Sequence, residues 1–326
     1  MRANRVVMTA PGPPAVLRYE PYDVAAPAAG EVLIRQSAVG LNYIDIQHRT
    51  GRYALPRYPS PIGMEGAGVI EAVGAEVEGF NPGDRVVYSA MPIGAYADLR
   101  LMPADRLVPL PATIPNELAA AVFTKGITAH YLIFTTFAVK AGDTILVHAA
   151  AGGVGLILCQ WAKHLGATVI GTVGSEAKAE IARAHGCDAA IVTAAEDFVA
   201  AVKRLTHGAG VAAVFDSVGR DTFEKSLRCL KPCGLLVTFG TASGPIAPFD
   251  LFELNRLGSL YVTSPAFVTH TADRDELLAR ATALFDAIAA GIVKATVGFT
   301  YPLAQAARAH EDLQARRTVG AGILVP

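Results

Sequence analysis

Residues 142–163 constrain the fold of this chain more than any other segment, because they predict a strand, a tight turn and a helix in direct succession. Residues 144–148 form a short apolar run typical of a buried strand, and residues 154–165 carry apolar side chains at helical spacing. The turn between them, residues 149–155, contains only small residues and one valine. Such a turn gathers backbone N–H groups at the positive end of a helix dipole, which suits a diphosphate.

The glycines of this turn match part of the dinucleotide-binding fingerprint. Gly152 and Gly155 occupy the second and third glycine positions, and Ala150 occupies the first. An alanine at the first position predicts a slightly wider turn. The alternative interpretation is a tight packing turn that holds no ligand. The strand before it and the helix after it favour the nucleotide interpretation.

The middle of the chain alternates between strands and helices. We expect strands at 144–148, 168–172, 189–193, 212–216, 234–239 and 259–263, and helices at 154–165, 176–185, 195–206 and 221–230. Alternation at this spacing predicts an α/β fold with a doubly wound parallel sheet. Two short helices, 116–122 and 128–134, are expected just before it.

The two ends of the chain share a different pattern. Several short alternating runs before residue 124 are separated by turn signals, which favours a partly closed antiparallel β-barrel. Near the C-terminus we expect helices at 273–290 and 303–314 and strands at 293–297 and 322–325. We therefore predict one domain made of residues 1–124 and 267–326, with a nucleotide-binding domain, 125–266, inserted into it.

The composition narrows the class of protein. Hydrophobic residues make up 52% of the chain and charged residues 17%, which fits a soluble protein with large buried cores. The formal net charge of −1 gives no basic excess to attract nucleic acid or a membrane surface. No apolar stretch has the length of a membrane span, and the N-terminus lacks the apolar core of a signal peptide. The four cysteines imply no disulfide framework, so the expected location is cytoplasmic.

The expected second strand indicates which dinucleotide would bind. In folds of this kind that strand often ends in an acidic residue that binds the ribose hydroxyls of NAD. Here it ends in Gly174 and Ser175, and Lys178 follows on the next helix. A serine and a lysine favour a 2′-phosphate, so we predict NADPH as the cofactor rather than NADH. Glu176 weakens this argument, and Lys178 can also be explained as a solvated helix residue.

Taken together, the motifs resemble a known family. They are residues 142–143, Leu146, 150–153, Gly155, Gln160 and Lys163 around the turn, with 42–45, 63–66, 83–86, 125–128, 216–219 and 258–263 elsewhere. The whole chain resembles the quinone oxidoreductases of the zinc-independent medium-chain dehydrogenase/reductase group, relatives of zeta-crystallin. The match is to the bacterial type.

The resemblance implies a GroES-like catalytic domain, an inserted Rossmann domain and NADPH bound in a cleft between them. It places Asn42 and Thr128 near the nicotinamide, and Gly152, Gly153 and Val154 at the diphosphate. The other positions that it implies for the cofactor are Ser175 and Lys178 at the 2′-phosphate, Ser217 and Val218 at the adenine side, Phe239 and Gly240 at the nicotinamide half, and Arg316. Thr193 stands where relatives often carry a tyrosine beside the adenosine phosphate, which predicts a weaker contact there.

No metal site is expected. Zinc relatives carry Gly-His-Glu where this chain has Gly63-Met64-Glu65, and the first 150 residues contain no cysteine. Cys229 and Cys233 have ligand-like spacing at an expected helix end, but no second pair accompanies them. We interpret them as half-buried thiols, and Glu65 as a structural carboxylate that accepts backbone hydrogen bonds.

Without metal or flavin, the nicotinamide itself must deliver the electrons as a hydride. A quinone accepts two electrons readily and needs little activation beyond positioning. The predicted catalytic residues are Asn42, Tyr53 and Thr128, with Tyr53 as the candidate substrate contact; a loop tyrosine packed on the barrel is the alternative. Tyr43, Asp45 and Lys125 are further polar candidates, and His48 and His130 are interpreted as structural.

Two other functions stay open at this stage. The first is an NADPH-dependent reductase of enals, enones or enoyl thioesters, and the second is an NADPH-binding crystallin-like or RNA-binding protein. A homodimer is expected from the resemblance, through the edge strand at residues 258–267, although that strand could instead be covered within one chain.

Overall fold

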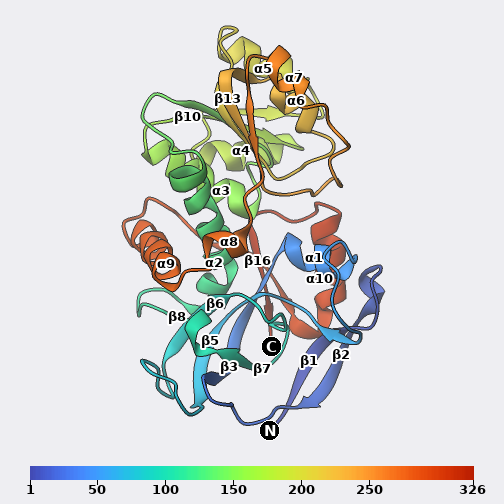
Figure 1. Cartoon of the computed structure of the whole chain (residues 1–326), viewed down its shortest axis with the longest axis vertical. Helices are drawn as coiled ribbons and strands as arrows, with labels where there is room; N and C mark the ends of the chain where they lie inside the picture. The colour runs from blue at the N-terminus through green and yellow to red at the C-terminus, as the bar shows by residue number, and fades with distance from the viewer. The chain divides into compact units, whose positions relative to one another are not determined.

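The structure is a computed structural model that describes all residues, Met1–Pro326. The chain divides into two compact units (Figure 1). The first unit contains Met1–Lys125, Ala281–Phe285 and Ala295–Pro326, and the second contains Gly126–Arg280 and Asp286–Lys294.

The first unit is built on two sheets. The three-stranded sheet has the order β2 (Leu17–Asp23), β1 (Arg2–Met8), β4 (Ser60–Pro61). The larger sheet has the order β15 (Val297–Pro302), β16 (Ala321–Val325), β3 (Glu31–Leu41), β5 (Glu65–Val73), β6 (Arg85–Ser89), β8 (Val108–Pro109), and β7 (Leu99–Pro103) also pairs with β3. A bridge between Arg5 and Ala97 joins the β1 strand to the loop before β7. The pairings are antiparallel apart from β15 with β16, which is parallel.

Short helices accompany these sheets. They are η1 (Pro14–Val16), α1 (Tyr43–Arg49), η2 (Ala104–Arg106), η4 (Leu303–Gln305) and α10 (Ala306–Gln314). The core between the sheets contains Ile34, Ile70, Tyr88, Tyr96 and Leu324, all buried. Strands β3 and β5 approach closely, since a Cβ at Gly68 would collide with the carbonyl oxygen of Arg35.

The second unit is a six-stranded parallel sheet with helices packed against it. Its order is β11 (Ala189–Val192), β10 (Thr168–Val173), β9 (Thr144–Val147), β12 (Val211–Asp216), β13 (Leu230–Thr238), β14 (Tyr261–Thr263). The helices are α3 (Gly153–His164), α4 (Glu176–Ala184), α5 (Phe198–Leu205), α6 (Phe223–Leu227), α7 (Phe252–Arg256), α8 (Phe267–His270) and most of α9 (Arg274–Ala289). The strand order reverses between β9 and β12, which confirms the doubly wound fold and defines its topological switch point.

The core of this sheet comes from successive strands. Leu146, Ile170, Val214 and Leu236 are buried at equivalent heights on β9, β10, β12 and β13, and Phe198 of α5 covers them. These strands are buried on both faces, which explains why they read as continuous apolar runs in the sequence.

Four details differ from the sequence-based expectations. Residues 116–122 and 128–134 are not two helices but one, α2 (Asn116–Tyr131), which continues as a π-helical turn, Leu132–Thr136. The expected strand at 293–297 is wrong. There the backbone N–H of Lys294 donates to the side-chain oxygen of Gln160 instead of to a neighbouring strand.

The third and fourth differences concern α6 and the C-terminal segments. Helix α6 ends at Leu227, and β13 begins at Leu230, so Cys233 lies in a strand with a left-handed backbone rather than on a helix end. Residues 267–280 and 286–294, which the sequence placed in the first domain, belong to the second unit in this structure. Arg280 accounts for part of this grouping, because it donates to the Thr135 hydroxyl and to the carbonyl of His270.

The helix Asn116–Thr136 is long and apolar enough to pass a length-and-composition test for a membrane span. However, 72% of its most apolar window is buried inside the structure, which is what a core helix shows.

Candidate active site

The turn after β9 places small residues in a conformation that few side chains could share. Ala149 adopts a left-handed backbone with φ of 52°, and α3 starts at Gly153 with Gly152 as its N-cap. A Cβ at Gly155 would collide with the Ala149 carbonyl oxygen and lie 2.8 Å from Ala150 Cα. The glycine at 155 therefore lets the start of α3 pack directly against the backbone of the turn. As the first residues of a helix, Gly153 and Val154 point N–H groups outward without intrahelical acceptors, where a diphosphate would bind.

The alanine at the first fingerprint position is accommodated by the neighbouring strand. A Cβ added to Gly171 of β10 would lie 2.6 Å from the Ala150 methyl carbon and 2.7 Å from the sulfur of Cys187. Gly171 thus supplies the room that the fingerprint glycine usually supplies. No separate signal in the sequence pointed to this residue.

His148 ties the start of the turn to two other elements. Its Nδ1 lies 2.8 Å from the Thr172 hydroxyl of β10, and its Nε2 lies 2.8 Å from the Ser226 hydroxyl of α6. Burial lowers the pKa of His148, and the charge of Asp216 opposes that shift. A neutral imidazole with both nitrogens satisfied fixes where the turn begins, and this role was missed in the sequence.

The predicted 2′-phosphate residues lie at the end of β10. Ser175 is the N-cap of α4, where its hydroxyl accepts the backbone N–H of Lys178 at 3.4 Å. Glu176, which weakened the phosphate argument, is engaged with Arg183 at 2.8 Å. The Thr193 hydroxyl donates to the carbonyl of Val173. Ser175 and Thr193 therefore lie at the carboxyl ends of adjacent strands, β10 and β11.

A second loop closes the other side of the switch point. Asp216, at the end of β12, accepts the backbone N–H groups of Val218 at 2.7 Å and Gly219 at 3.1 Å. A Cβ on Gly240 would lie 2.7 Å from the carbonyl oxygen of Ser217. The structure thus brings together the predicted residues that follow β12 and β13: Ser217, Val218, Phe239 and Gly240. Ligands of doubly wound sheets bind at this carboxyl edge, on both sides of the reversal in strand order.

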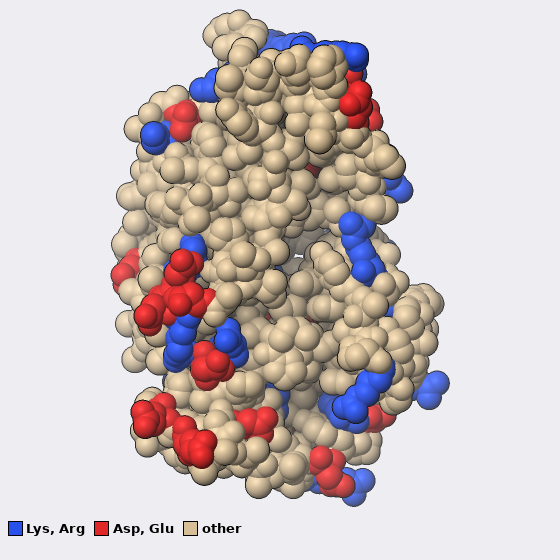
Figure 2. All heavy atoms as spheres, viewed as in Figure 1, with Lys and Arg blue, Asp and Glu red and all other residues tan.

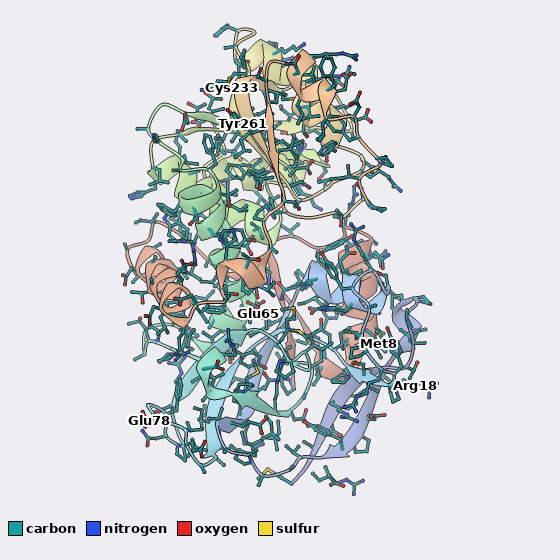
Figure 3. The ribbon with its side chains drawn as sticks, viewed as in Figure 1. Met8, Arg18, Glu65, Glu78, Cys233 and Tyr261 are labelled. Carbon is teal, nitrogen blue, oxygen red and sulfur yellow. The ribbon has the colours of Figure 1, made fainter.

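In the first unit, Asn42 belongs to a buried polar cluster with Glu65 and Lys125. The Asn42 Nδ2 donates to Glu65 Oε2 at 2.7 Å, and Lys125 Nζ donates to Asn42 Oδ1 at 2.8 Å. Lys125 Nζ also lies 3.3 Å from Glu65 Oε2. Figure 3 marks Glu65, which is fully buried, while Asn42 and Lys125 are each 7% exposed.

The loop that carries Asn42 is held by a further buried network. Asp45 Oδ2 accepts the Asn42 backbone N–H at 2.9 Å and the Tyr96 hydroxyl at 3.1 Å, and the Tyr96 oxygen lies 3.0 Å from His310 Nε2. Burial raises the pKa of Asp45 to about 7 and lowers the pKa of His310 to about 3. Asp45 thereby caps the N-terminus of α1, as the third residue of a capping box with Asn42.

The remaining predicted site residues occupy scattered positions within their own units. Tyr53 is 51% exposed on the loop after α1, with its ring centroid 5.8 Å from that of His48. Thr128 is buried in α2. Arg316 follows α10 with a left-handed φ of 58°. None of these three belongs to the Asn42 cluster.

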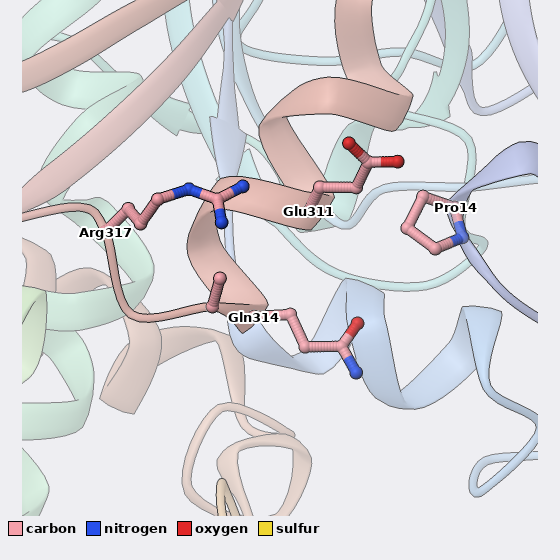
Figure 4. A pocket seen from close by; sticks show the side chains of 5 residues that line it. Pro14, Glu311, Gln314 and Arg317 are labelled. Carbon is pink, nitrogen blue, oxygen red and sulfur yellow. The ribbon is translucent and has the colours of Figure 1, made fainter.

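Two further observations concern ligands. No group of three or more His, Cys, Asp or Glu side chains is arranged to hold a metal ion. A pocket beside α10 is lined by Pro14, Glu311, Gln314, Ala315 and Arg317 (Figure 4). It contains no residue that the sequence predicted for cofactor or substrate.

Family models define the class of protein. Residues 28–112 match the alcohol dehydrogenase GroES-like domain, and residues 153–283 match the domain of zinc-binding dehydrogenases. The chain thus combines the two domains of a medium-chain dehydrogenase/reductase.

Comparison with characterised proteins defines the family. The chain is 48% identical to a quinone oxidoreductase of Pseudomonas aeruginosa, over 99% of this chain and 100% of the relative. It is 42% identical to a 2-haloacrylate reductase of a Burkholderia species, over 94% of each. The solved structure of Escherichia coli quinone oxidoreductase complexed with NADPH superposes with a TM-score of 0.98 at 44% identity, covering 99% of this chain and 100% of that one. The chain belongs to the zeta-crystallin-like quinone oxidoreductases, of the bacterial type.

Proposed function

We propose that this protein is an NADPH-dependent quinone reductase that works without metal or flavin. Relatives named quinone oxidoreductases at 44–48% identity over the full chain support the substrate class, and the NADPH complex of one such relative supports the cofactor. The single structural observation that carries the proposal is the turn at 149–155, where small residues pack closely against the start of α3.

The residues of this chain fit the cofactor. The turn binds the diphosphate through Gly152, Gly153 and Val154, and the end of β10 binds the 2′-phosphate through Ser175 and Lys178. Ser217, Val218, Phe239 and Gly240 flank the adenine and nicotinamide halves at the same sheet edge, with Thr193 beside the adenosine phosphate. Asn42, Thr128 and Arg316 complete the proposed set. Bound NADPH supplies the hydride, and Tyr53 contacts the quinone.

Cofactor choice is tested by measuring kcat/KM for NADPH and NADH with 1,4-benzoquinone. The wild-type protein should favour NADPH. K178M should reduce that preference by roughly ten- to a hundredfold, because one charge-assisted hydrogen bond to a phosphate contributes about 1.5–3 kcal/mol. R183M serves as the control, since Arg183 pairs with Glu176 on the same helix. An unchanged preference in K178M would remove Lys178 from the site.

A second candidate is supported by the 2-haloacrylate reductase among the relatives. That name points to an activated alkene as acceptor, which agrees with the enal, enone or enoyl-thioester alternative. Turnover with 9,10-phenanthrenequinone, crotonyl-CoA and 2-chloroacrylate separates the two. Faster turnover of an alkene acceptor would replace the quinone proposal.

A crystallin-like or RNA-binding role is the candidate from another class. On the face shown in Figure 2, basic side chains lie in small groups separated by uncharged and acidic residues, so this face offers no continuous basic surface for a phosphate backbone. NADPH-displaceable RNA binding in a gel-shift assay, with no quinone turnover, would favour this role.

We also propose a homodimer formed through β14, and a cytoplasmic location. Strand β14 ends the sheet, so one of its edges has no partner strand within the chain. Tyr261 on β14 is 60% exposed and is marked in Figure 3 near Cys233 of the adjacent strand. Unpaired edges of this kind pair readily with a second copy. Sedimentation at low micromolar concentration should show a dimer, and Y261D should shift it toward monomer.

A further inference from the structure

Glu65 and Lys125 bind opposite ends of the Asn42 side-chain amide, one as a hydrogen-bond acceptor and the other as a donor. The carboxylate of Glu65 can only accept a hydrogen bond, and it faces Nδ2 at 2.7 Å. The ammonium of Lys125 can only donate, and it faces Oδ1 at 2.8 Å. The oxygen and nitrogen of an asparagine amide are assigned from surrounding chemistry of this kind.

Both neighbours specify the same orientation. Rotating the amide by half a turn would set Oδ1 against the carboxylate and Nδ2 against the ammonium, so two hydrogen bonds to charged groups would be lost at once. Each such bond contributes about 1.5–3 kcal/mol, so the flipped amide is excluded at room temperature. One Nδ2–H and one Oδ1 lone pair remain for a ligand.

The surroundings hold Glu65 itself in place. Its other oxygen, Oε1, accepts the backbone N–H of Thr124 at 2.6 Å. A Cβ at Gly40 of β3 would collide with Oε2, so the glycine opens the space in which the carboxylate meets Asn42. The carboxylate therefore has little freedom to turn away.

A buried ion pair is weak support for stability, because removing both charges from water costs about as much as their attraction returns. Glu65 is fully buried and the Lys125 side chain is 8% exposed. Their retention inside the first unit is better explained by what they do to Asn42 than by a gain in folding free energy.

We infer that Glu65 and Lys125 are positioning residues that lock the Asn42 amide in one orientation, so that it offers an N–H donor and an oxygen acceptor to cofactor or substrate. The inference rests on the proposed function only for the identity of that ligand. The locked amide is a property of the chain alone and is tested separately.

The central variant is E65Q/K125M, which removes both charges together. The introduced glutamine can accept from the amide or donate to it, and the introduced methionine does neither, so nothing distinguishes the two orientations of Asn42. The matched control is R35M/E71Q, which removes a partly exposed ion pair of 2.7 Å between β3 and β5, the strand that also carries Glu65. E65Q alone keeps Lys125 and should have the smaller effect.

The structural readout is NMR of protein labelled with ¹⁵N only at its five asparagines. The Asn42 side-chain NH₂ pair is assigned by its loss in N42A. In the wild-type protein and in R35M/E71Q, the Asn42 NH₂ group should give a single, sharp pair of resonances that exchange slowly with solvent. In E65Q/K125M it should shift, and its exchange with solvent should rise at least tenfold.

The kinetic readout is turnover of 1,4-benzoquinone with NADPH and with 4-deuterated NADPH. E65Q/K125M should lower kcat at least tenfold and raise the primary isotope effect, while the Kd for NADPH changes less than threefold because the glycine turn still binds the diphosphate. A general loss of folded protein would lower the active fraction and leave the isotope effect unchanged.

The outcomes separate the two ideas. If the wild-type protein does not reduce quinones, the proposed function fails, and the NMR pair still decides the positioning role. Unchanged Asn42 signals in E65Q/K125M overturn the inference, as do kinetics within twofold of the wild type. If E65Q/K125M does not fold, E65Q/K125Q, which also removes both charges but keeps polar side chains, takes its place and must perturb the Asn42 pair measurably for the inference to stand.

Discussion

The glycine turn of the second unit and the Asn42 cluster of the first unit are two candidate ligand sites that are built in opposite ways. The turn is built from seven consecutive small or apolar residues, 149–155, whose backbone packs too closely at Gly155 to admit a Cβ. The cluster joins Asn42 to two long charged side chains that lie 23 and 83 residues away from it in the chain. Local backbone shape determines the first site, whereas tertiary packing of buried charges determines the second.

This difference predicts different sensitivities to substitution. The turn should tolerate changes of charge and fail when a methyl group is added. The cluster should tolerate changes of size better than the loss of one charge.

Removing one charge of the buried Glu65–Lys125 pair should have the largest effect on the free energy of unfolding. K125M leaves Glu65 as an uncompensated buried charge and should lower the free energy of unfolding by about 3–5 kcal/mol. E65Q/K125M should recover most of that loss. Urea denaturation of both variants measures the difference. R35M leaves only a partly exposed partner, Glu71, and should change stability by less than about 1 kcal/mol. Equal losses in K125M and R35M would contradict the buried-charge account.

The network beneath Asn42 should respond to pH through Asp45. Its pKa rises from 3.8 to about 7 in the folded state, so the folded protein loses stability relative to the unfolded chain as pH rises through that window. D45N removes this loss, and the Asn oxygen can still accept where Oδ2 does. Compared with the wild type, D45N should therefore gain up to about 4 kcal/mol between low and neutral pH. Thermal unfolding at a series of pH values measures this gain.

His310 should make stability change with pH in the opposite direction in the same series of thermal unfolding measurements. Its pKa falls from 6.5 to about 3, so its contribution to stability is lost as pH falls below about 6.5. H310Q should flatten the acid side of the curve and leave the Asp45 effect intact. Parallel curves for D45N, H310Q and the wild type would show that neither group titrates as the burial implies.

Adding a methyl group to the turn should abolish tight cofactor binding. G155A forces a Cβ into the Ala149 carbonyl oxygen, which should lower the free energy of unfolding by about 1–3 kcal/mol through overpacking. Because the turn must shift to relieve this collision, we expect the Kd for NADPH to rise on the order of 100-fold. G152A places its Cβ 3.1 Å from the same oxygen and should have a milder effect. Fluorescence titration of NADPH ranks them. A stronger effect of G152A than of G155A would contradict the geometry.

Filling the space between Gly171 and Ala150 should have the smallest effect on NADPH binding. G171A brings a Cβ to 2.6 Å from the Ala150 methyl and should lower stability by about 1–3 kcal/mol, with a smaller loss of NADPH affinity than G155A. Gly174, just beyond the end of the same strand, has open space around its Cβ position and serves as the control. G174A should change stability by less than about 0.5 kcal/mol. Urea denaturation of the two variants measures the difference.

The contrast between the two sites also explains what could be predicted. The turn, the alternating strands and the doubly wound sheet follow from patterns within short windows, so they were correct to within a few residues. The strand expected at 293–297 was wrong because Lys294 bonds to Gln160, a residue more than a hundred positions away. The split of α2 into two helices was wrong because tertiary burial stabilises one continuous helix across Lys125 and Gly126.

The sequence by its own patterns predicted the strand, tight turn and helix at 142–165 and the doubly wound sheet, because the spacing of small and apolar residues sets backbone geometry locally. Sequence resemblance added the family and the expected set of cofactor residues. The packed structure was needed to show that Glu65 and Lys125 face Asn42, that Gly171 makes room for Ala150, and that His148 anchors the turn. Each of these contacts joins residues distant in the chain, and the strength of a buried hydrogen bond depends on a geometry that exists only after the elements pack.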